Sequence, residues 1–117
     1  MYGAAMLHDP PVNEIKAELF RALAHPVRIR ALELLVEHPC TVSELQAEMG
    51  IDAARVSQQL SVLRRADLVR TERSGTTVTY SIKDPLLGDL LAVARRLLIA
   101  SLEARRDLLH ELERSGR

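Results

Sequence analysis

Residues 41–66, TVSELQAEMGIDAARVSQQLSVLRRA, decide the fold of this chain. Thr41 and Glu44 have the spacing of a capping box, in which a threonine oxygen and a glutamate carboxylate each accept a backbone N–H, so a short helix begins here. Gly50 ends that helix, and Asp52 is a good N-cap for a second helix that follows almost at once. Two short helices joined by a tight, glycine-containing turn predict a helix-turn-helix.

The second helix, residues 53–66, has one apolar and one polar side. Val56, Leu60 and Leu63 recur at helical spacing and are expected to face the core. The second helix of such a motif enters the DNA major groove, where Gln58 could contact adenine and Arg55 guanine or phosphate. Arg64 lies nearer the buried flank. The DNA-contacting residues predicted on this helix are Ala54, Arg55, Ser57, Gln58, Gln59, Ser61 and Arg65.

After Asp67 the periodicity changes from helical to alternating. Val78, Tyr80 and Ile82 alternate with small polar residues, and a run from residue 68 to 73 can pair with them through Ser74-Gly75. This pattern predicts a β-hairpin over residues 68–82. Its cationic tip is expected close to the DNA backbone or minor groove and consists of Arg73, Ser74, Gly75, Thr76 and Thr77.

Two helices precede the motif. With Asn13 as N-cap, residues 13–24 predict a helix in which Ile15, Leu19, Phe20 and Leu23 recur at helical spacing, after a flexible arm of residues 1–12. Pro26 fits the first position of the next helix, with His25 as its cap. That helix is expected to bury Ile29, Leu32, Leu35 and Val36 and to leave Arg28 and Arg30 outside.

A long helix, residues 84–113, is predicted to close the chain. Its apolar stripe is wider than a domain of this size can cover, so we expect a second copy of the chain to cover it in a two-fold interface that also involves the helix over residues 13–24. The predicted dimer-interface residues are Leu19, Leu87, Leu91, Leu98, Leu102 and Leu109.

The composition agrees with one small, mainly helical domain. The chain has 117 residues, of which 47% are hydrophobic and only 3% aromatic, a balance typical of helical cores. The net charge is zero, but residues 53–83 hold six cations and two anions, so this region suits a polyanion. Phosphate loops, a nucleophile elbow and an HExxH motif are absent, which argues against an enzyme. Without a signal peptide or an 18-residue apolar run, no membrane association is expected, and the single Cys40 favours the reducing cytoplasm.

Together these elements predict a mainly α fold, a winged helix-turn-helix with a β-hairpin wing and a long C-terminal dimerisation helix. Several segments in order resemble the ArsR-type (arsenic-repressor-like) bacterial transcriptional regulators: LAHPVRIRALELL at 23–35, TVSEL at 41–45 and VSQQLSVLRRADLV at 56–69. The resemblance implies a homodimeric repressor that binds double-stranded DNA at a palindromic operator. It also implies polar residues at positions 57–59, which this chain has, and often a serine where Ala53 and Ala54 stand.

The metal sites of that family are not matched. The family's cysteine box would fall on Thr41, Ser43 and Gln46, and the C-terminal helix carries Asp107, His110 and Glu113 without the upstream half of the family's site. We therefore expect no metal and no cofactor; the effector is an unidentified small molecule or absent. Cys40 stands one residue before a helix N-cap, where a thiol pKa can be lowered, so a thiol-responsive regulator stays an alternative. A second alternative is a winged helix that binds a protein partner instead of DNA.

Overall fold

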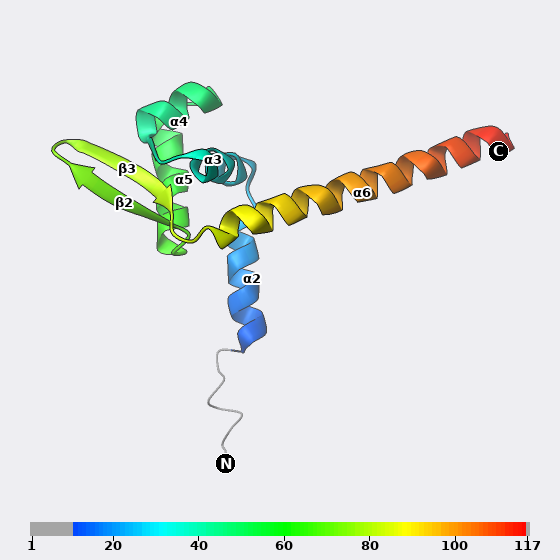
Figure 1. Ribbon diagram of the computed structural model, residues 1–117, viewed down its shortest axis with the longest axis horizontal. Coiled ribbons are helices and arrows are strands. Elements are labelled where there is room, and N and C mark those ends of the chain that lie inside the picture. Colours follow the sequence, from blue (N-terminus) through cyan, green and yellow to red (C-terminus); the bar gives the residue numbers. More distant parts are fainter. Residues whose placement is uncertain (1–10, 117) are drawn as a thin grey trace, which may run out of the picture. The chain divides into compact units, whose positions relative to one another are not determined.

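The computed structural model describes residues 11–116 and confirms a mainly helical winged helix-turn-helix (Figure 1). Most of the predicted arm, residues 1–10, lies outside the described residues. The helices are α2 (Val12–Leu23), α3 (Pro26–Glu37), α4 (Val42–Met49), α5 (Ala53–Arg65) and α6 (Leu86–Ser115). The strands are β1 (Cys40–Thr41), β2 (Val69–Ser74) and β3 (Thr77–Ile82). Residues 11–84 belong to one compact unit, and α6 belongs to a second unit.

Most of the predicted helix starts are confirmed by their capping bonds. The Nδ1 atom of His25 accepts a hydrogen bond from the Val27 backbone N–H at 3.1 Å, with Pro26 as the first residue of α3. The Thr41 N–H donates to Glu44 Oε1 at 2.8 Å and the Glu44 N–H donates to Thr41 Oγ1 at 3.2 Å, which completes the capping box of α4. Gly50 ends α4 in the left-handed conformation, with φ +68°.

The predicted N-cap of α2 is wrong by two residues. Asn13 lies inside the helix, and Pro11 is the N-cap, without a side-chain capping bond. The Pro11 carbonyl instead accepts the Glu14 N–H at 2.9 Å, and its extended backbone leads directly into Val12. The predicted arm of residues 1–12 therefore overlaps α2 at residue 12, which is already helical.

The core of the unit formed by residues 11–84 lies between α3, α4 and α5. Its largest fully buried side chains are Leu32, Leu45, Leu60, Leu63 and Val56, so the predicted apolar side of α5 is confirmed. The prediction for α3 is partly wrong. Leu32 and Leu35 are buried, but Ile29 and Val36 are 37% and 39% exposed, while Ala31 and Leu34 take their place.

The buried face of α3 is therefore turned toward Ala31 and Leu35, since α4, α5 and β3 all pack against this helix. At 100° per residue Arg28 falls on the same side of α3 as these two residues, about one turn before Ala31 and two turns before Leu35. Arg28 is accordingly half-buried, and the expectation that it would lie outside is wrong. Its guanidinium has three hydrogen-bond partners.

The wing belongs to a three-stranded antiparallel sheet in the order β1-β3-β2. The hairpin β2–β3 was predicted, and Gly75, with φ +63°, opens its two-residue turn. The two-residue strand β1 was not predicted; Cys40 pairs with Tyr80 and Thr41 with Thr79. At the base of the wing, Asp67 has a left-handed backbone conformation with φ +64°. Its Oδ1 atom accepts a hydrogen bond from Lys83 Nζ at 2.5 Å. Thr41 therefore joins the wing sheet directly to the start of α4.

Helix α6 has 30 residues and starts two residues later than predicted, because Pro85 is its N-cap. Most of its large apolar side chains are at least 42% exposed: Leu86, Val93, Leu97, Leu98, Ile99, Leu102, Leu108, Leu109 and Leu112. None of the helices within residues 11–116 is long and apolar enough to cross a membrane.

Candidate DNA-binding surface

Helix α5 carries the surface with the most potential DNA contacts. Val56, Leu60 and Leu63 are at most 1% exposed and fix the inner side of the helix. The Oδ1 atom of Asp52 accepts the Arg55 N–H at 2.8 Å, which secures the first turn. The packing of the inner side and the N-cap together fix which side chains α5 presents on its outer side.

The outer side of α5 forms a shallow, open depression. Its lining includes Asp52, a carboxylate that was predicted only as a helix cap. Six of the seven predicted contact residues on this helix are exposed: Ala54, Arg55, Ser57, Gln58, Ser61 and Arg65. Arg64 lies four residues after the buried Leu60, on the flank nearer the core as predicted, but its side chain is exposed beside Ser61 and Arg65. The helix therefore presents three arginines and several short polar side chains to solvent.

Ser61 is restricted in what it can offer to DNA. Its Oγ donates to the Ser57 backbone carbonyl one turn earlier, at 3.0 Å. Because a serine hydroxyl has one hydrogen, only its lone pairs remain. In this arrangement Ser61 can accept a hydrogen bond but cannot donate one.

Gln59 differs from the other predicted contacts, because it is half-buried and already bonded. Its Oε1 accepts from Arg28 Nη1 at 2.8 Å. The other edge of the same guanidinium donates to two backbone carbonyls at the end of α2, from Nε to Ala22 at 2.6 Å and from Nη2 to Arg21 at 3.1 Å. No pattern in the sequence indicates this contact, since residues 28 and 59 are 31 positions apart in the chain.

The wing supplies a second group of polar side chains. The residues of its predicted tip are all exposed: Arg73, Ser74, Gly75, Thr76 and Thr77. Arg73 pairs with Val78 and Ser74 with Thr77 in the register of the hairpin. Nearer the base, Arg70 Nε donates to Ser81 Oγ at 3.3 Å. Arg73 therefore lies close to the turn, within the antiparallel pairing of β2 and β3.

Cys40 is not the reactive thiol that its place before a helix suggests. The residue is 4% exposed, and its Sγ donates to the His38 carbonyl at 3.4 Å. Burial, and then the nearby carboxylates of Glu44, Glu37 and Glu48, raise the pKa of the Cys40 thiol above its ordinary value of 9.0. The expected lowering by the helix N-terminus is therefore wrong, because desolvation and negative charge outweigh it.

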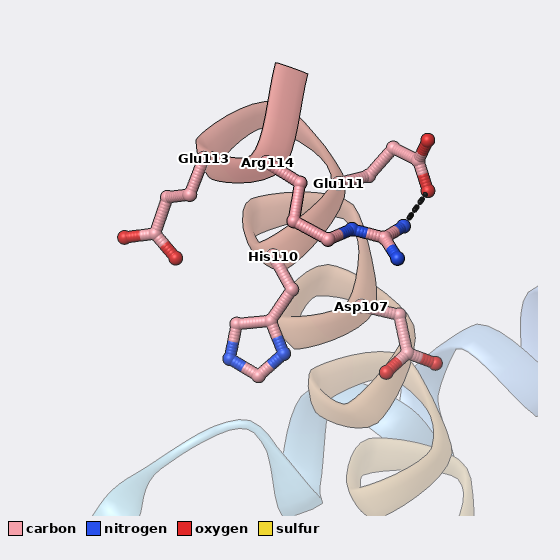
Figure 2. A pocket seen from close by; sticks show the side chains of 5 residues that line it. All are labelled: Asp107, His110, Glu111, Glu113 and Arg114. Carbon is pink, nitrogen blue, oxygen red and sulfur yellow. Dashed lines mark hydrogen bonds and ion pairs between the residues drawn. The ribbon is translucent and has the colours of Figure 1, made fainter. Parts of the chain in front are cut away.

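The end of α6 carries a polar cluster, shown in Figure 2. Arg114 Nη2 lies 2.7 Å from Glu111 Oε2, and the His110 ring stands on the turn that follows Asp107. The Glu113 carboxylate points away from Asp107, so the three residues with ligand spacing do not converge. Within the part of the chain that the structure describes, no group of three or more His, Cys, Asp or Glu side chains is placed to hold a metal.

The predicted dimer residues differ in the surface that they leave free. Leu98, Leu102 and Leu109 are 50–59% exposed. Leu19 and Leu91 are half-buried. Leu87 is only 6% exposed, so it has little surface left for a partner, contrary to the prediction.

Comparisons with known proteins identify the family of this chain. Residues 25–71 match the family model described as "Bacterial regulatory protein, arsR family". An uncharacterized HTH-type transcriptional regulator of Mycobacterium tuberculosis, Rv0081, is 45% identical over 111 residues, covering 94% of this chain and 97% of its own. This chain belongs to the ArsR family. It is therefore a DNA-binding transcriptional regulator and not an enzyme.

Solved structures of three similar proteins share the fold. The crystal structure of Rv0081 has a TM-score of 0.75 at 49% identity, covering 81% of this chain and 96% of that one. A homodimeric winged helix-turn-helix domain from Mycobacterium bovis, Mb0332, has a TM-score of 0.74 at 25% identity, covering 83% and 90%. The repressor BigR from Xylella fastidiosa has a TM-score of 0.67 at 32% identity, covering 83% and 96%.

Proposed function

We propose that this ArsR-family chain is a homodimeric repressor that works in the cytoplasm and binds a palindromic operator through α5 and the wing. The observation that carries the proposal is the outer side of α5, where exposed polar and cationic side chains lie on a helix fixed by its core and its N-cap. Mb0332, a structural neighbour, is described as homodimeric, and BigR as a repressor. In a two-fold dimer each α5 meets one half-site, which favours a palindrome.

The roles proposed for the site residues divide into reading and anchoring. Gln58, exposed in the middle of the outer side, reads a base edge, with Ala54, Arg55, Ser57, Ser61 and Arg65 around it. Arg73 at the wing tip binds a phosphate, beside Ser74, Gly75, Thr76 and Thr77. We propose a non-metal effector or none, since the described residues of one protomer offer no converging ligands.

Selection of bound sites from random duplex DNA tests the function directly. The wild-type protein is expected to enrich a palindrome, and its affinity should fall steeply with salt as counterions are released. If the winged helix binds a protein partner instead, no sequence is enriched. A non-palindromic enriched site would refute the two-fold arrangement but not DNA binding.

Two alanine variants then separate the proposed roles. Gln58→Ala is expected to cost about 1–3 kcal/mol and to relax the preference at one symmetric base-pair position. Arg73→Ala should weaken binding to all sequences alike and lower the slope of log affinity against log salt by about one unit per protomer. If Gln58→Ala leaves affinity and preference intact in a folded protein, α5 is not the reading helix.

A further inference from the structure

We infer that Arg28 is a positioning residue for DNA binding: it holds Gln59 by its amide oxygen, so that the amide NH₂, a hydrogen-bond donor, is the group turned to DNA. The inference rests on the proposed function of α5. It starts from the bond between Arg28 Nη1 and Gln59 Oε1, 2.8 Å long and half-buried.

The chemistry of arginine fixes the orientation of the Gln59 amide. A guanidinium has N–H donors and no acceptor, so the amide atom that faces it must be the oxygen. The amide nitrogen is then the group left for other partners, and it carries two hydrogens. An unrestrained glutamine reads adenine with both amide atoms, one accepting and one donating. The contact with Arg28 uses one of the two lone pairs of the Gln59 oxygen and holds this atom toward α3.

The position of Gln59 on the helix says where this donor acts. Gln59 lies four residues after Arg55, and residues with this spacing are neighbours on one flank of a helix. Arg55 is exposed and Gln59 is half-buried, so the flank runs from solvent toward α3. The matching DNA groups are acceptors: a phosphate oxygen, or a base acceptor such as guanine O6 or thymine O4.

The other contacts of Arg28 explain why its guanidinium is held firmly. The carbonyls of Arg21 and Ala22 lie in the last turn of α2, where helix carbonyls lack their usual partners four residues on. The Arg21 carbonyl also accepts the Ala24 N–H at 3.2 Å. The fork of Arg28 binds both carbonyls and still directs Nη1 to Gln59. Lysine has a single ammonium group and cannot span three separate acceptors in this geometry. Arg28 thus fixes the reading helix to the end of α2.

A double-mutant cycle tests whether Arg28 acts through Gln59. The probe is the strongest duplex that the wild-type protein selects from random DNA, and affinity is measured for Arg28→Lys, Gln59→Met and the double variant. Each single variant is expected to bind about tenfold more weakly, and the double variant no more weakly than the weaker single one. Arg30→Lys is the matched control, because Arg30 is exposed on the same helix and pairs with Glu33; it should bind within about twofold of wild type.

Further outcomes identify the acceptor or overturn the inference. A loss of equal size on a scrambled duplex identifies a phosphate oxygen, and a loss on the selected duplex alone identifies a base acceptor. Losses that multiply in the double variant, or an Arg28→Lys protein that melts earlier but binds normally, overturn the inference. If Arg28→Lys does not fold, Gln59→Glu replaces it in the test. The glutamate keeps an acceptor for Arg28 but has no NH₂ donor, so this variant should retain the wild-type melting temperature and lose DNA affinity. Unchanged affinity overturns the inference. If the wild type selects no DNA at all, the proposed function fails instead.

Discussion

Replacing Leu98 by alanine tests the proposed dimer through the exposed apolar stripe of α6. The Leu98 side chain is 59% exposed on α6. Full burial of a leucine stabilises by about 1.5–3 kcal/mol, so covering the exposed part is worth about 1–2 kcal/mol. Alanine keeps one of the four side-chain carbons and therefore loses most of this gain.

Two-fold symmetry doubles the effect, since every interface residue occurs twice. Leu98→Ala is thus expected to weaken the dimer by roughly 1.5–2.5 kcal/mol, about 10- to 70-fold in its dissociation constant. Arg96→Ala is the matched control: Arg96 is exposed and lies 200° around the helix from Leu98. Leucine and arginine have similar helix propensities, so both changes affect α6 itself about equally.

Sedimentation equilibrium over a range of protein concentrations measures the dissociation constant of each variant. The reasoning is refuted if Leu98→Ala and Arg96→Ala dimerise alike, because the apolar stripe would then not be the contact. A wild-type protein that is monomeric at micromolar concentration would refute the dimer itself and, with it, the palindromic operator.

Three further predictions concern single side chains. Asp52→Asn keeps an N-cap oxygen for the Arg55 N–H and removes a negative charge from the outer side of α5, so DNA affinity should rise at low salt with an unchanged melting temperature; a fall in affinity would contradict this. The Cys40 thiol should react slowly with iodoacetamide at pH 7 until urea unfolds the chain, because its pKa is raised; rapid alkylation of the native protein would show an accessible thiolate. The Thr41 backbone N–H, then the rest of the capping box, lowers the pKa of Glu44 below its ordinary value of 4.5, so this carboxylate stabilises the fold above that value and the contribution is lost as the pH falls through the lowered pKa. In Glu44→Gln, unfolding curves below pH 4.5 should depend less on pH than those of the wild type.

Local patterns in the sequence predicted most of the fold. Capping residues such as Thr41 and Asp52, the proline at 26 and the alternation after Asp67 each act within a few residues, so the elements they define are confirmed. What was missed depends on packing between distant segments. The strand β1 exists only because residues 40 and 41 meet Tyr80 and Thr79, and two residues carry no periodic signal.

The candidate site shows the same division. Helical spacing was enough to place Gln58 and Arg55 on the outer side of α5. It could not show that Gln59 is held by Arg28, because this bond joins two residues that are 31 positions apart and lie on different helices. Nor could the place of Cys40 before a helix reveal the burial and the three carboxylates that raise its pKa.

The pairing of β1 with β3 has a consequence for the shape of the DNA that this protein prefers. Thr41 is both a strand residue of the wing sheet and the N-cap of α4, so the wing and the helix-turn-helix share one hydrogen-bonded frame. The spacing between the wing tip and the reading helix is then set before any duplex is met. DNA must supply the matching groove width, and sequences that adopt this width with little deformation bind best. Sequence preference should therefore extend to base pairs that no side chain touches.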